Sequence, residues 1–261
     1  RVWIVNTGEP LPIDSGCQRL LRAGLLTRIL RDRGHEVVWW ASTFDHARKA
    51  HRSGGDVVHR VADGLKLFLM HGSAYGRNLS PRRMLNHREV AGKFRRFSRS
   101  EARPDVILCS LPTLELAYEA TRYGVRSGVP VVLDIRDLWP DLFLEMSPGW
   151  AKWPARFLLQ GMYHAARQSC ARATAITGVT KEYVEWGLRK AGRRIGPSDR
   201  PFPLAYSDEA PSEAERSGAR EFWRSRGVEE GAPEFRICFF GTLGWQVQLE
   251  AALHAVGRLA A

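Results

Sequence analysis

Short apolar runs alternate along the chain with longer stretches in which apolar residues recur every three or four positions. The short runs predict β-strands, and the longer stretches predict amphipathic helices. The predicted strands are 1–6, 36–41, 56–61, 65–70, 105–110, 129–134 and 173–179, and the predicted helices are 16–33, 81–103, 112–127, 154–171 and 181–190. This alternation predicts βαβ units and therefore an α/β fold: a Rossmann-like, doubly wound parallel sheet with helices on both faces.

The alternation breaks once, and the break predicts the domain organisation. Residues 191–217 hold four prolines and mixed charge, a composition typical of a connection. After it we predict a short helix at 217–226, a strand at 234–240 and a helix from Leu249. We therefore expect a first domain at 1–195, a connection at 196–232, and the first βα unit of a second Rossmann-like domain at 233–261. Because the chain opens in a strand and closes in a helix, we expect it to be a piece of a longer protein.

Composition restricts the class of protein. The 261 residues include 39 Lys and Arg against 28 Asp and Glu, which gives a net charge of +11 and a pI of about 10.0. Hydrophobic residues make up 44% and charged residues 26%, which excludes a disordered chain. No apolar run approaches the ~18 residues of a transmembrane helix. The four cysteines are scattered and no histidines have ligand spacing, so we expect a cytoplasmic protein with no bound metal and no cofactor.

The predicted helix 81–103 carries eight Lys and Arg against two Glu, more than half of the net charge. Its apolar residues gather on one face of a helical wheel, which predicts packing on the sheet. The opposite face holds Arg88, Arg95, Arg96 and Arg99. This face is either a solvated surface or one drawn to anionic lipid, since each basic residue near a membrane contributes ~1 kcal/mol. No aromatic residues interleave with the arginines, so we expect no nucleic-acid partner, although the pI alone would suit one.

The loop between the first strand and the first helix contains Asp14, Ser15 and Gly16. Ligands of open α/β sheets bind beyond the carboxyl ends of the strands, where helix N-termini present partial positive charge. Gly16 would let a phosphate or a sugar approach the helix backbone. Alternatively, Asp14 and Ser15 cap the helix and have no other role. The loop is not GxGxxG, so a dinucleotide site is only weakly indicated.

The string Asp134-Ile135-Arg136-Asp137-Leu138-Trp139-Pro140 follows an apolar run at 131–133. We expect its charges to begin where the strand leaves the sheet, at the edge where ligands bind. An arginine between two aspartates can form a fixed ion-pair network that presents a carboxylate or the guanidinium to a ligand. The alternative interpretation is a structural salt bridge that anchors the following loop.

Three further features have open interpretations. The turn Gly241-Thr242-Leu243-Gly244 follows a predicted strand, and two glycines there suit the close approach of a diphosphate. Trp150 and Trp153 form either an aromatic wedge at a membrane interface or a buried lid after Pro140, and we favour burial. The eight histidines form no HxH or HExxH pattern and GxSxG is absent, so no hydrolase triad is indicated.

Taken in order, these segments resemble the family 4 glycosyltransferases of the GT-B fold, and most of all the bacterial subgroup that builds exopolysaccharides, capsules and O-antigens. The resemblance covers essentially the whole chain, and its specific part is DIRDLWP. The segments that carry it are 2–33 with Gly34-His35-Glu36-Val37, Pro104-Asp105-Val106-Ile107, the DIRDLWP string, 175–181, and 239–244 with Leu249-Glu250.

The resemblance implies two Rossmann-like domains, of which the first mainly binds the acceptor and the second binds a nucleotide-sugar. It also implies sugar transfer with retention of anomeric configuration, without a metal, in the cleft between the domains. Arg136 and Asp137 would be catalytic residues on the acceptor side of that cleft. We expect acceptor binding by Asp14, Asp134, Thr180 and Lys181, and donor binding by Gly16, Gly241 and Gly244.

We therefore expect a glycosyltransferase that moves a hexosyl or N-acetylhexosaminyl group from a UDP- or GDP-sugar to a lipid-linked or oligosaccharide acceptor in surface polysaccharide biosynthesis. An anionic membrane surface is a further expected partner, with the protein peripheral at the inner face of the plasma membrane. The chain ends before the basic pair and the paired glutamates that hold the donor in this family, so we expect this piece to be inactive alone. The alternative is a non-catalytic sugar- or nucleotide-binding module, which arginine at position 136, where many relatives have histidine, would favour.

Overall fold

The computed structural model describes residues 1–261 except 16–18, 79, 206–209, 232–234, 240–248 and 260–261. The chain forms two compact units, Arg1–Ser207 and Asp208–Ala261. The first unit extends beyond the boundary of 195 that the sequence suggests, because a two-residue strand at Arg200–Pro201 joins its sheet. Each unit is described below by itself.

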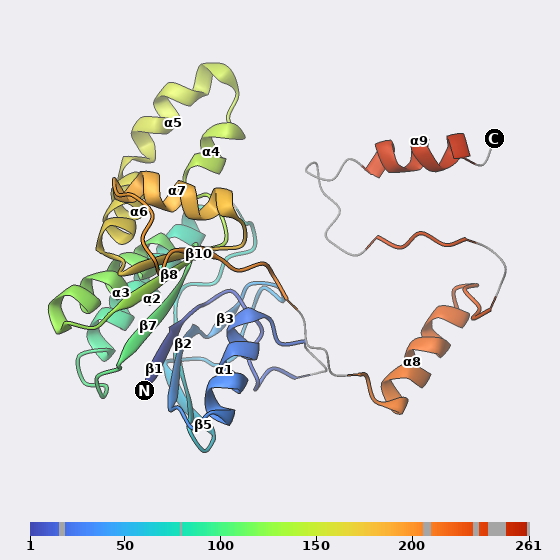
Figure 1. Cartoon of the computed structure of the whole chain (residues 1–261), viewed down its shortest axis with the longest axis horizontal. Helices are drawn as coiled ribbons and strands as arrows, with labels where there is room; N and C mark the ends of the chain where they lie inside the picture. Colours follow the sequence, from blue (N-terminus) through green and yellow to red (C-terminus); the bar gives the residue numbers. More distant parts are fainter. Residues whose placement is uncertain (16–18, 79, 206–209, 232–234, 240–248, 260–261) are drawn as a thin grey trace. The chain divides into compact units, whose positions relative to one another are not determined.

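An eight-stranded sheet forms the centre of the first unit (Figure 1). Its strands are β1 (Val2–Val5), β2 (Val37–Ser42), β5 (Val57–Ala62), β6 (Leu65–Met70), β7 (Val106–Leu111), β8 (Val131–Ile135), β9 (Ala175–Gly178) and β10 (Arg200–Pro201). They lie in the order β10-β9-β8-β7-β1-β2-β6-β5, and every neighbouring pair is parallel except β5 with β6. The predicted Rossmann-like α/β fold is confirmed.

Helices cover both faces of this sheet. The larger core lies under α2 (Pro81–Phe97), α3 (Leu114–Ser127), α6 (Gln160–Arg172) and α7 (Lys181–Ala191). The smaller core lies under α1 (Arg22–Asp32) on the other face. Strand β1 serves both cores, because Trp3 and Val5 pack into the larger and Ile4 packs into the smaller. This alternation is the two-residue period of a strand buried on both faces.

The strand order reverses between β1 and β7. From β1 the chain first builds one half of the sheet through β2, β5 and β6, and then builds the other half through β7, β8, β9 and β10. In open α/β sheets, ligands bind beyond the carboxyl ends of the strands that flank such a reversal. A ligand site is therefore expected at the carboxyl ends of β1 and β7.

Several boundaries in the first unit differ from the sequence prediction. Helix α1 begins at Arg22, because the chain before it is extended at Leu21 and the backbone amide of Ala23 donates to the Glu9 carboxylate at 2.8 Å. Helix α2 ends at Phe97 rather than at residue 103. A small hairpin of β3 (Phe44–Asp45) and β4 (Ala50–His51) was not predicted, since two-residue strands leave no alternation to detect.

The predicted helix 154–171 is two helices, α5 (Lys152–Leu158) and α6, because Leu159 leaves helical geometry with φ −86° and ψ 2°. They are preceded by α4 (Asp141–Glu145) and a 3-10 turn at Gly149–Ala151. Figure 1 shows α4 and α5 projecting from the first unit beyond α7. The prediction that Trp150 and Trp153 are buried is wrong. Each is 83% exposed, because this projection lies outside the helices that cover the sheet.

The second unit contains two described helices, α8 (Glu213–Arg224) and α9 (Leu249–Leu259). Helix α8 begins four residues before the predicted 217–226, because Ser212 and Glu215 form a capping box at its start. The predicted strand at 234–240 is not formed by the described residues 235–239, which are exposed. A strand needs a hydrogen-bonding neighbour, and no described segment pairs with these residues.

Candidate functional site

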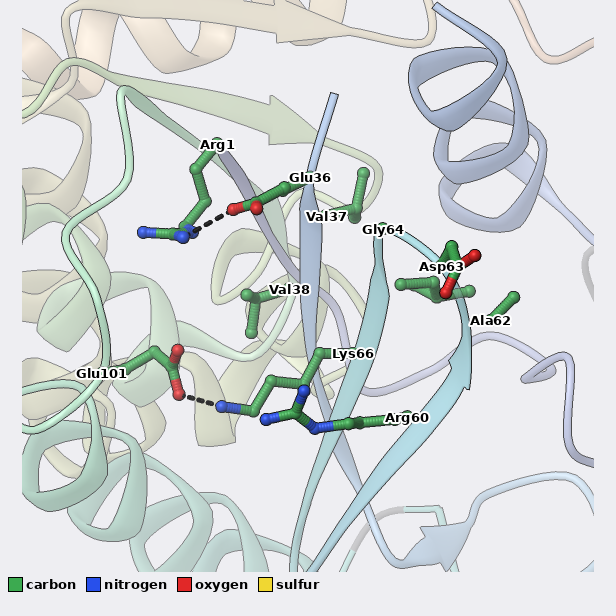
Figure 2. A pocket seen from close by; sticks show the side chains of 11 residues that line it. Arg1, Glu36, Val37, Val38, Arg60, Ala62, Asp63, Gly64, Lys66 and Glu101 are labelled. Atoms are coloured by element: carbon green, nitrogen blue, oxygen red, sulfur yellow. Dashed lines mark hydrogen bonds and ion pairs between the residues drawn. The ribbon is translucent and has the colours of Figure 1, made fainter. Parts of the chain in front are cut away.

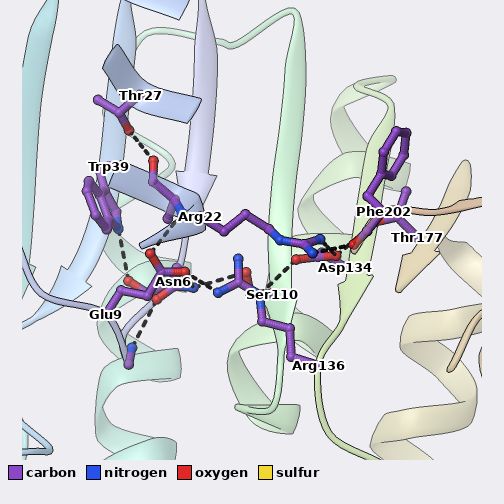
Figure 3. Close-up of polar contacts among 12 residues, drawn as sticks. Asn6, Glu9, Arg22, Thr27, Trp39, Ser110, Asp134, Arg136, Thr177 and Phe202 are labelled. Atoms are coloured by element: carbon purple, nitrogen blue, oxygen red, sulfur yellow. Dashed lines mark hydrogen bonds and ion pairs between the residues drawn. The ribbon is translucent and has the colours of Figure 1, made fainter. Parts of the chain in front are cut away.

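A row of polar side chains crosses the carboxyl ends of four neighbouring strands. Ser110, Asp134 and Thr177 lie opposite one another in the register of β7, β8 and β9, and Asn6 directly follows β1. Asn6 Nδ2 donates to Ser110 Oγ at 3.0 Å, and Thr177 Oγ1 donates to Asp134 Oδ1 at 3.1 Å (Figure 3). All four side chains are buried. The topological switch between β1 and β7 is therefore lined by paired hydrogen-bonding groups.

Four charged side chains form a continuous chain of ion pairs over this row. Arg136 pairs with Glu9 through one guanidinium nitrogen and with Asp134 through Nε at 2.8 Å. Arg22 Nη1 lies 3.0 Å from the other oxygen of Asp134, and Arg22 also donates to the carbonyl of Phe202 (Figure 3). Negative and positive side chains thus alternate along this series of ion pairs, from Glu9 through Arg136 and Asp134 to Arg22. The series ties the first loop, the first turn of α1 and the end of β8 together.

The structure corrects one detail of the DIRDLWP string. Strand β8 continues through Ile135, so Asp134 lies inside the sheet rather than beyond its end. Arg136 does form the expected ion-pair network with Asp134. Its second carboxylate partner is Glu9 rather than Asp137, because Glu9 reaches it from the loop that follows β1.

Because Glu9 and Asp134 are buried, their negative charges depend strongly on the positive charges paired with them. The side chains of Glu9 and Asp134 are only 4% and 2% exposed. Burial alone would lower the pKa of the Arg136 guanidinium, but the charges of Glu9 and Asp134 outweigh burial and raise it. Arg136 Nη2 is buried and has no hydrogen-bond partner among the described residues. Arg136 therefore stays charged and keeps one donor that its two carboxylates do not use.

Asp137 lies next to this network in a different environment. No hydrogen bond or ion pair to its carboxylate is found in the described part of the chain. Burial raises the pKa of Asp137, and the charge of Arg83 opposes that shift only in part. Arg83 belongs to α2 and lies over the ring of Trp139, 4.6 Å from its centroid. Asp137 is thus a half-buried acid near the positive charge of Arg83, to which it forms no ion pair.

A wall of basic and aromatic side chains continues from Arg83. The guanidinium of Arg83 lies 5.8 Å from the ring of Tyr75, whose hydroxyl is 2.9 Å from His46 Nδ1. Burial, with the positive charges of Arg83 and Lys49, lowers the pKa of His46 to about 4. Burial and Arg83 also lower the pKa of Lys49. His46 is therefore neutral near pH 7, and the wall carries its positive charge on Arg83 and Lys49.

Asp14 holds the first loop rather than capping α1. Arg52 grips both carboxylate oxygens of Asp14, at 2.6 and 2.7 Å, and the backbone amide of Leu11 donates to one of them. Burial disfavours the ionised form, but these hydrogen bonds outweigh burial and lower the pKa of Asp14. The geometry favours a structural role for Asp14, and its acceptor-binding role stays a prediction. Gly16, Gly241 and Gly244 lie outside the described residues.

Thr180 and Lys181 lie at the start of α7, beyond the end of β9. The Thr180 hydroxyl donates to Glu182, and Lys181 is 77% exposed, 3.6 Å from Glu185. Within the described chain, neither side chain has a polar contact with the network around Arg136. Their acceptor-binding role stays a prediction.

The arginines of α2 that were predicted to face a membrane are all exposed. The apolar face opposite them packs as expected, with Val90, Ala91 and Phe94 buried. Because α2 leads from the end of β6 to the start of β7, its last turn lies at the amino edge of the sheet. Arg95 in that turn and Arg99, which follows the helix, line a cavity of about 270 Å³. They therefore lie at the edge opposite the site.

A larger cavity, of about 400 Å³, also lies at the amino edge of the sheet (Figure 2). It is lined by the starts of β2 and β6, and four of its six charged side chains form two ion pairs. Arg1 lies 2.5 Å from Glu36, and Lys66 pairs with Glu101. We therefore place the functional site at the carboxyl edge, where Asp137 and Arg136 Nη2 remain available.

No group of three or more His, Cys, Asp and Glu side chains that could hold a metal ion occurs among the described residues. No described helix is both long enough and apolar enough to cross a bilayer.

The fold and the polar switch point define a Rossmann-like α/β protein with a candidate ligand site at the carboxyl edge of its sheet. The glycosyl transferase 4-like domain family matches residues 21–198, and the chain belongs to this family. The matched region includes Arg22, Arg136 and Asp137, whereas Glu9 precedes it. The chain is therefore a glycosyltransferase domain of the GT-B type. No curated protein matches it.

Sequence reasoning missed three residues of the site. Glu9 and Arg22 gave no signal, because their partners Arg136 and Asp134 are 127 and 112 residues away. Arg83 was counted with the basic residues of 81–103. Its place in the first turn of α2, directly after the Ser80 cap, was the available signal that it points toward the strand ends.

Proposed function

We propose that the first unit binds the acceptor of a retaining glycosyltransferase at the carboxyl ends of β1, β7 and β8. The donor is a UDP- or GDP-sugar, and the transferred group is a hexosyl or N-acetylhexosaminyl residue. The acceptor is a lipid-linked or oligosaccharide chain in surface polysaccharide biosynthesis, reached by a protein that is peripheral at the inner face of an anionic membrane. Transfer uses no metal.

The unpaired carboxylate of Asp137 carries this proposal. A sugar acceptor presents hydroxyl groups, and a carboxylate without a protein partner accepts hydrogen bonds from them. Asp137 lies beside the topological switch point and within the family match. A half-buried acid whose pKa is raised, with only partial compensation from Arg83, is costly for the fold, which is typical of a functional group.

The neighbouring residues have distinct roles in this proposal. Arg136 offers Nη2 to an acceptor oxygen, while Glu9 and Asp134 hold its plane in place. Glu9, Asp134 and Arg22 are positioning residues, because their charges are used within the network. Arg83 supplies positive charge beside Asp137, and Lys49 adds positive charge near Arg83, which suits the phosphate of a lipid-linked acceptor.

The donor side belongs to the second unit in this proposal. Gly241 and Gly244 would form the turn against the donor diphosphate, and Gly16 would approach it from the first loop. Leaving of the nucleoside diphosphate requires positive charge and helix N-termini around the phosphates.

We expect Asp137→Asn to lower kcat/KM for sugar transfer by about 10- to 100-fold, because a hydrogen bond to a charged group is worth about 1.5–3 kcal/mol. The free energy of unfolding should stay the same or rise. The raised pKa means that the ionised form is disfavoured in the folded state, so removal of the charge should not lower stability. A transfer assay and a urea titration on the same protein measure both quantities.

Glu145→Gln is the matched control for this substitution. It removes a negative charge from an exposed side chain at the end of α4, eight residues further along the chain. Transfer by this variant should equal that of the wild type. Loss of stability in Asp137→Asn, with transfer unchanged, would make Asp137 structural and would contradict the proposal.

A non-catalytic sugar-binding module is the second candidate function. The observation that favours it is the occupation of Arg136 by two carboxylates, which leaves Nη2 as its one nitrogen without a partner among the described residues. Under this alternative the protein binds an oligosaccharide, and Asp137→Asn weakens that binding, but no sugar is transferred by the wild type.

A further inference from the structure

Large apolar side chains are exposed together on the projection formed by α4 and α5. We define the aromatic tip as Trp150, Trp153, Phe157 and Leu158, which are 83%, 83%, 66% and 82% exposed. Aromatic side chains contribute about 150–250 Å² each, so the three rings alone expose roughly 400 Å². A patch of this size on a monomer usually marks an interaction surface.

Basic side chains surround the aromatic tip. We define the basic rim as Lys152, Arg156 and Arg167, all exposed. Arg156 and Arg167 line an open groove of about 560 Å³ between α5 and α6, together with Trp153 and Phe157. No ion pair to any residue of the rim occurs within the described residues. The rim therefore keeps its full positive charge.

The sequence around the tip carries no negative charge. From residue 146 to residue 181 there are five Lys and Arg and no Asp or Glu, although the chain contains 28 acidic residues. The nearest acids are outside this stretch. Asp141 is bound by Lys190 at 2.8 Å and by Trp186, and Glu145 is exposed at the end of α4. A surface that is both aromatic and predominantly basic is complementary to an anionic one.

We propose that the aromatic tip inserts into the headgroup region of an anionic bilayer while the basic rim binds its phosphates. Tryptophan prefers this depth because its ring is apolar and its N–H is polar. Insertion removes the tip from water, and each basic residue near an anionic surface adds to the affinity. An anionic bilayer offers an apolar region to the aromatic tip and phosphates to the basic rim at the same time.

The position of the tip in the chain fits this role. Helix α4 begins at Asp141, four residues after Asp137, so the projection leaves the sheet at the site edge. The exposed arginines of α2 approach the opposite edge of the sheet. Docking through the tip brings the acceptor site toward the membrane, whereas docking through the last turn of α2 directs it away. The proposal rests on the peripheral membrane location in the proposed function and names the surface that binds the bilayer. Bilayer binding needs neither donor nor acceptor, so it can be tested apart from sugar transfer.

Vesicle flotation tests this proposal directly. Wild-type protein should float with vesicles of equal parts phosphatidylcholine and phosphatidylglycerol, and should stay in solution with phosphatidylcholine alone. The double variant W150A/W153A should bind the mixed vesicles at least tenfold more weakly. The triple variant K152Q/R156Q/R167Q should bind roughly 100-fold more weakly, at about fivefold per charge.

The matched control is R88Q/R95Q/R96Q, which removes the same number of charges from the exposed side of α2. It should bind within about threefold of the wild type, since only charges near the surface contribute fully. All substituted side chains are exposed, so thermal unfolding should be unchanged in every variant.

Three results would overturn the proposal. One is wild-type protein that does not float with the anionic vesicles. Another is flotation that survives W150A/W153A but is lost in R88Q/R95Q/R96Q, which would assign the membrane surface to α2. The third is a concentration-dependent dimer that W150A/W153A abolishes without vesicle binding, which would assign the tip to a second copy. None of these results bears on transfer activity.

Discussion

Replacing Arg136 with methionine should lower the free energy of unfolding of the first unit by about 3–5 kcal/mol at pH 7. The reason is the pair of carboxylates that it leaves behind. Glu9 and Asp134 are almost completely buried, and Arg22 reaches only Asp134. Glu9 then keeps two hydrogen bonds, from Ala23 and Asn6, but no opposite charge. Urea titration followed by circular dichroism measures the loss.

A double-mutant cycle separates this effect from the loss of packing. In the Arg136→Met background, Glu9→Gln removes the uncompensated charge and should recover on the order of 1–2 kcal/mol. Lys181→Met is the control, since Lys181 is 77% exposed and its pair with Glu185 contributes less than about 1 kcal/mol. A loss below about 1 kcal/mol in Arg136→Met would show that the ion-pair chain does not hold the site together.

The second large effect lies in the aromatic core beneath the site. Trp40 is fully buried and contacts Phe68, Trp3 and Phe94, with ring centroids 4.5, 5.1 and 5.1 Å away. Trp40→Ala should lower the free energy of unfolding by about 3–5 kcal/mol, through lost burial and the cavity that remains.

Two further substitutions make this prediction specific. Trp153→Ala removes the same side chain from an 83% exposed position and should change stability by less than about 0.5 kcal/mol. Trp40→Phe keeps a ring in the core and removes an indole N–H that has no hydrogen-bond partner among the described residues. It should therefore be much less destabilising than Trp40→Ala. Equal losses in Trp40→Ala and Trp153→Ala would contradict the assignment of the core.

The fold could be predicted from the sequence to the extent that its elements are long and periodic. The central strands, α3 and α7 have clear hydrophobic periodicity. The alternation of strands and helices along the chain was sufficient to predict the parallel sheet. The hairpin at 44–51 and strand β10 were missed, because two residues cannot show a period. The start of α1 was missed because the partner of its first turn is Glu9, which precedes the helix by more than ten residues.

The site could be predicted only where its residues are adjacent in the sequence. Asp134, Arg136 and Asp137 stand together, and their pattern indicated a charged strand end. The ion pairs with Glu9 and Arg22 could not be predicted, since these residues come from the other half of the strand order. The exposure of Trp150 and Trp153 depends on where α4 and α5 project. Composition favoured burial because tryptophan is usually buried.

The most direct test of the central claim is sugar transfer by the full-length protein, assayed with radiolabelled UDP- and GDP-sugars and a bacterial lipid extract as acceptor. The account predicts that label from one donor class enters a lipid or oligosaccharide product, and that Asp137→Asn lowers this incorporation by about 10- to 100-fold. Folded wild-type protein that transfers label from neither donor class would contradict it. So would transfer that Asp137→Asn leaves unchanged.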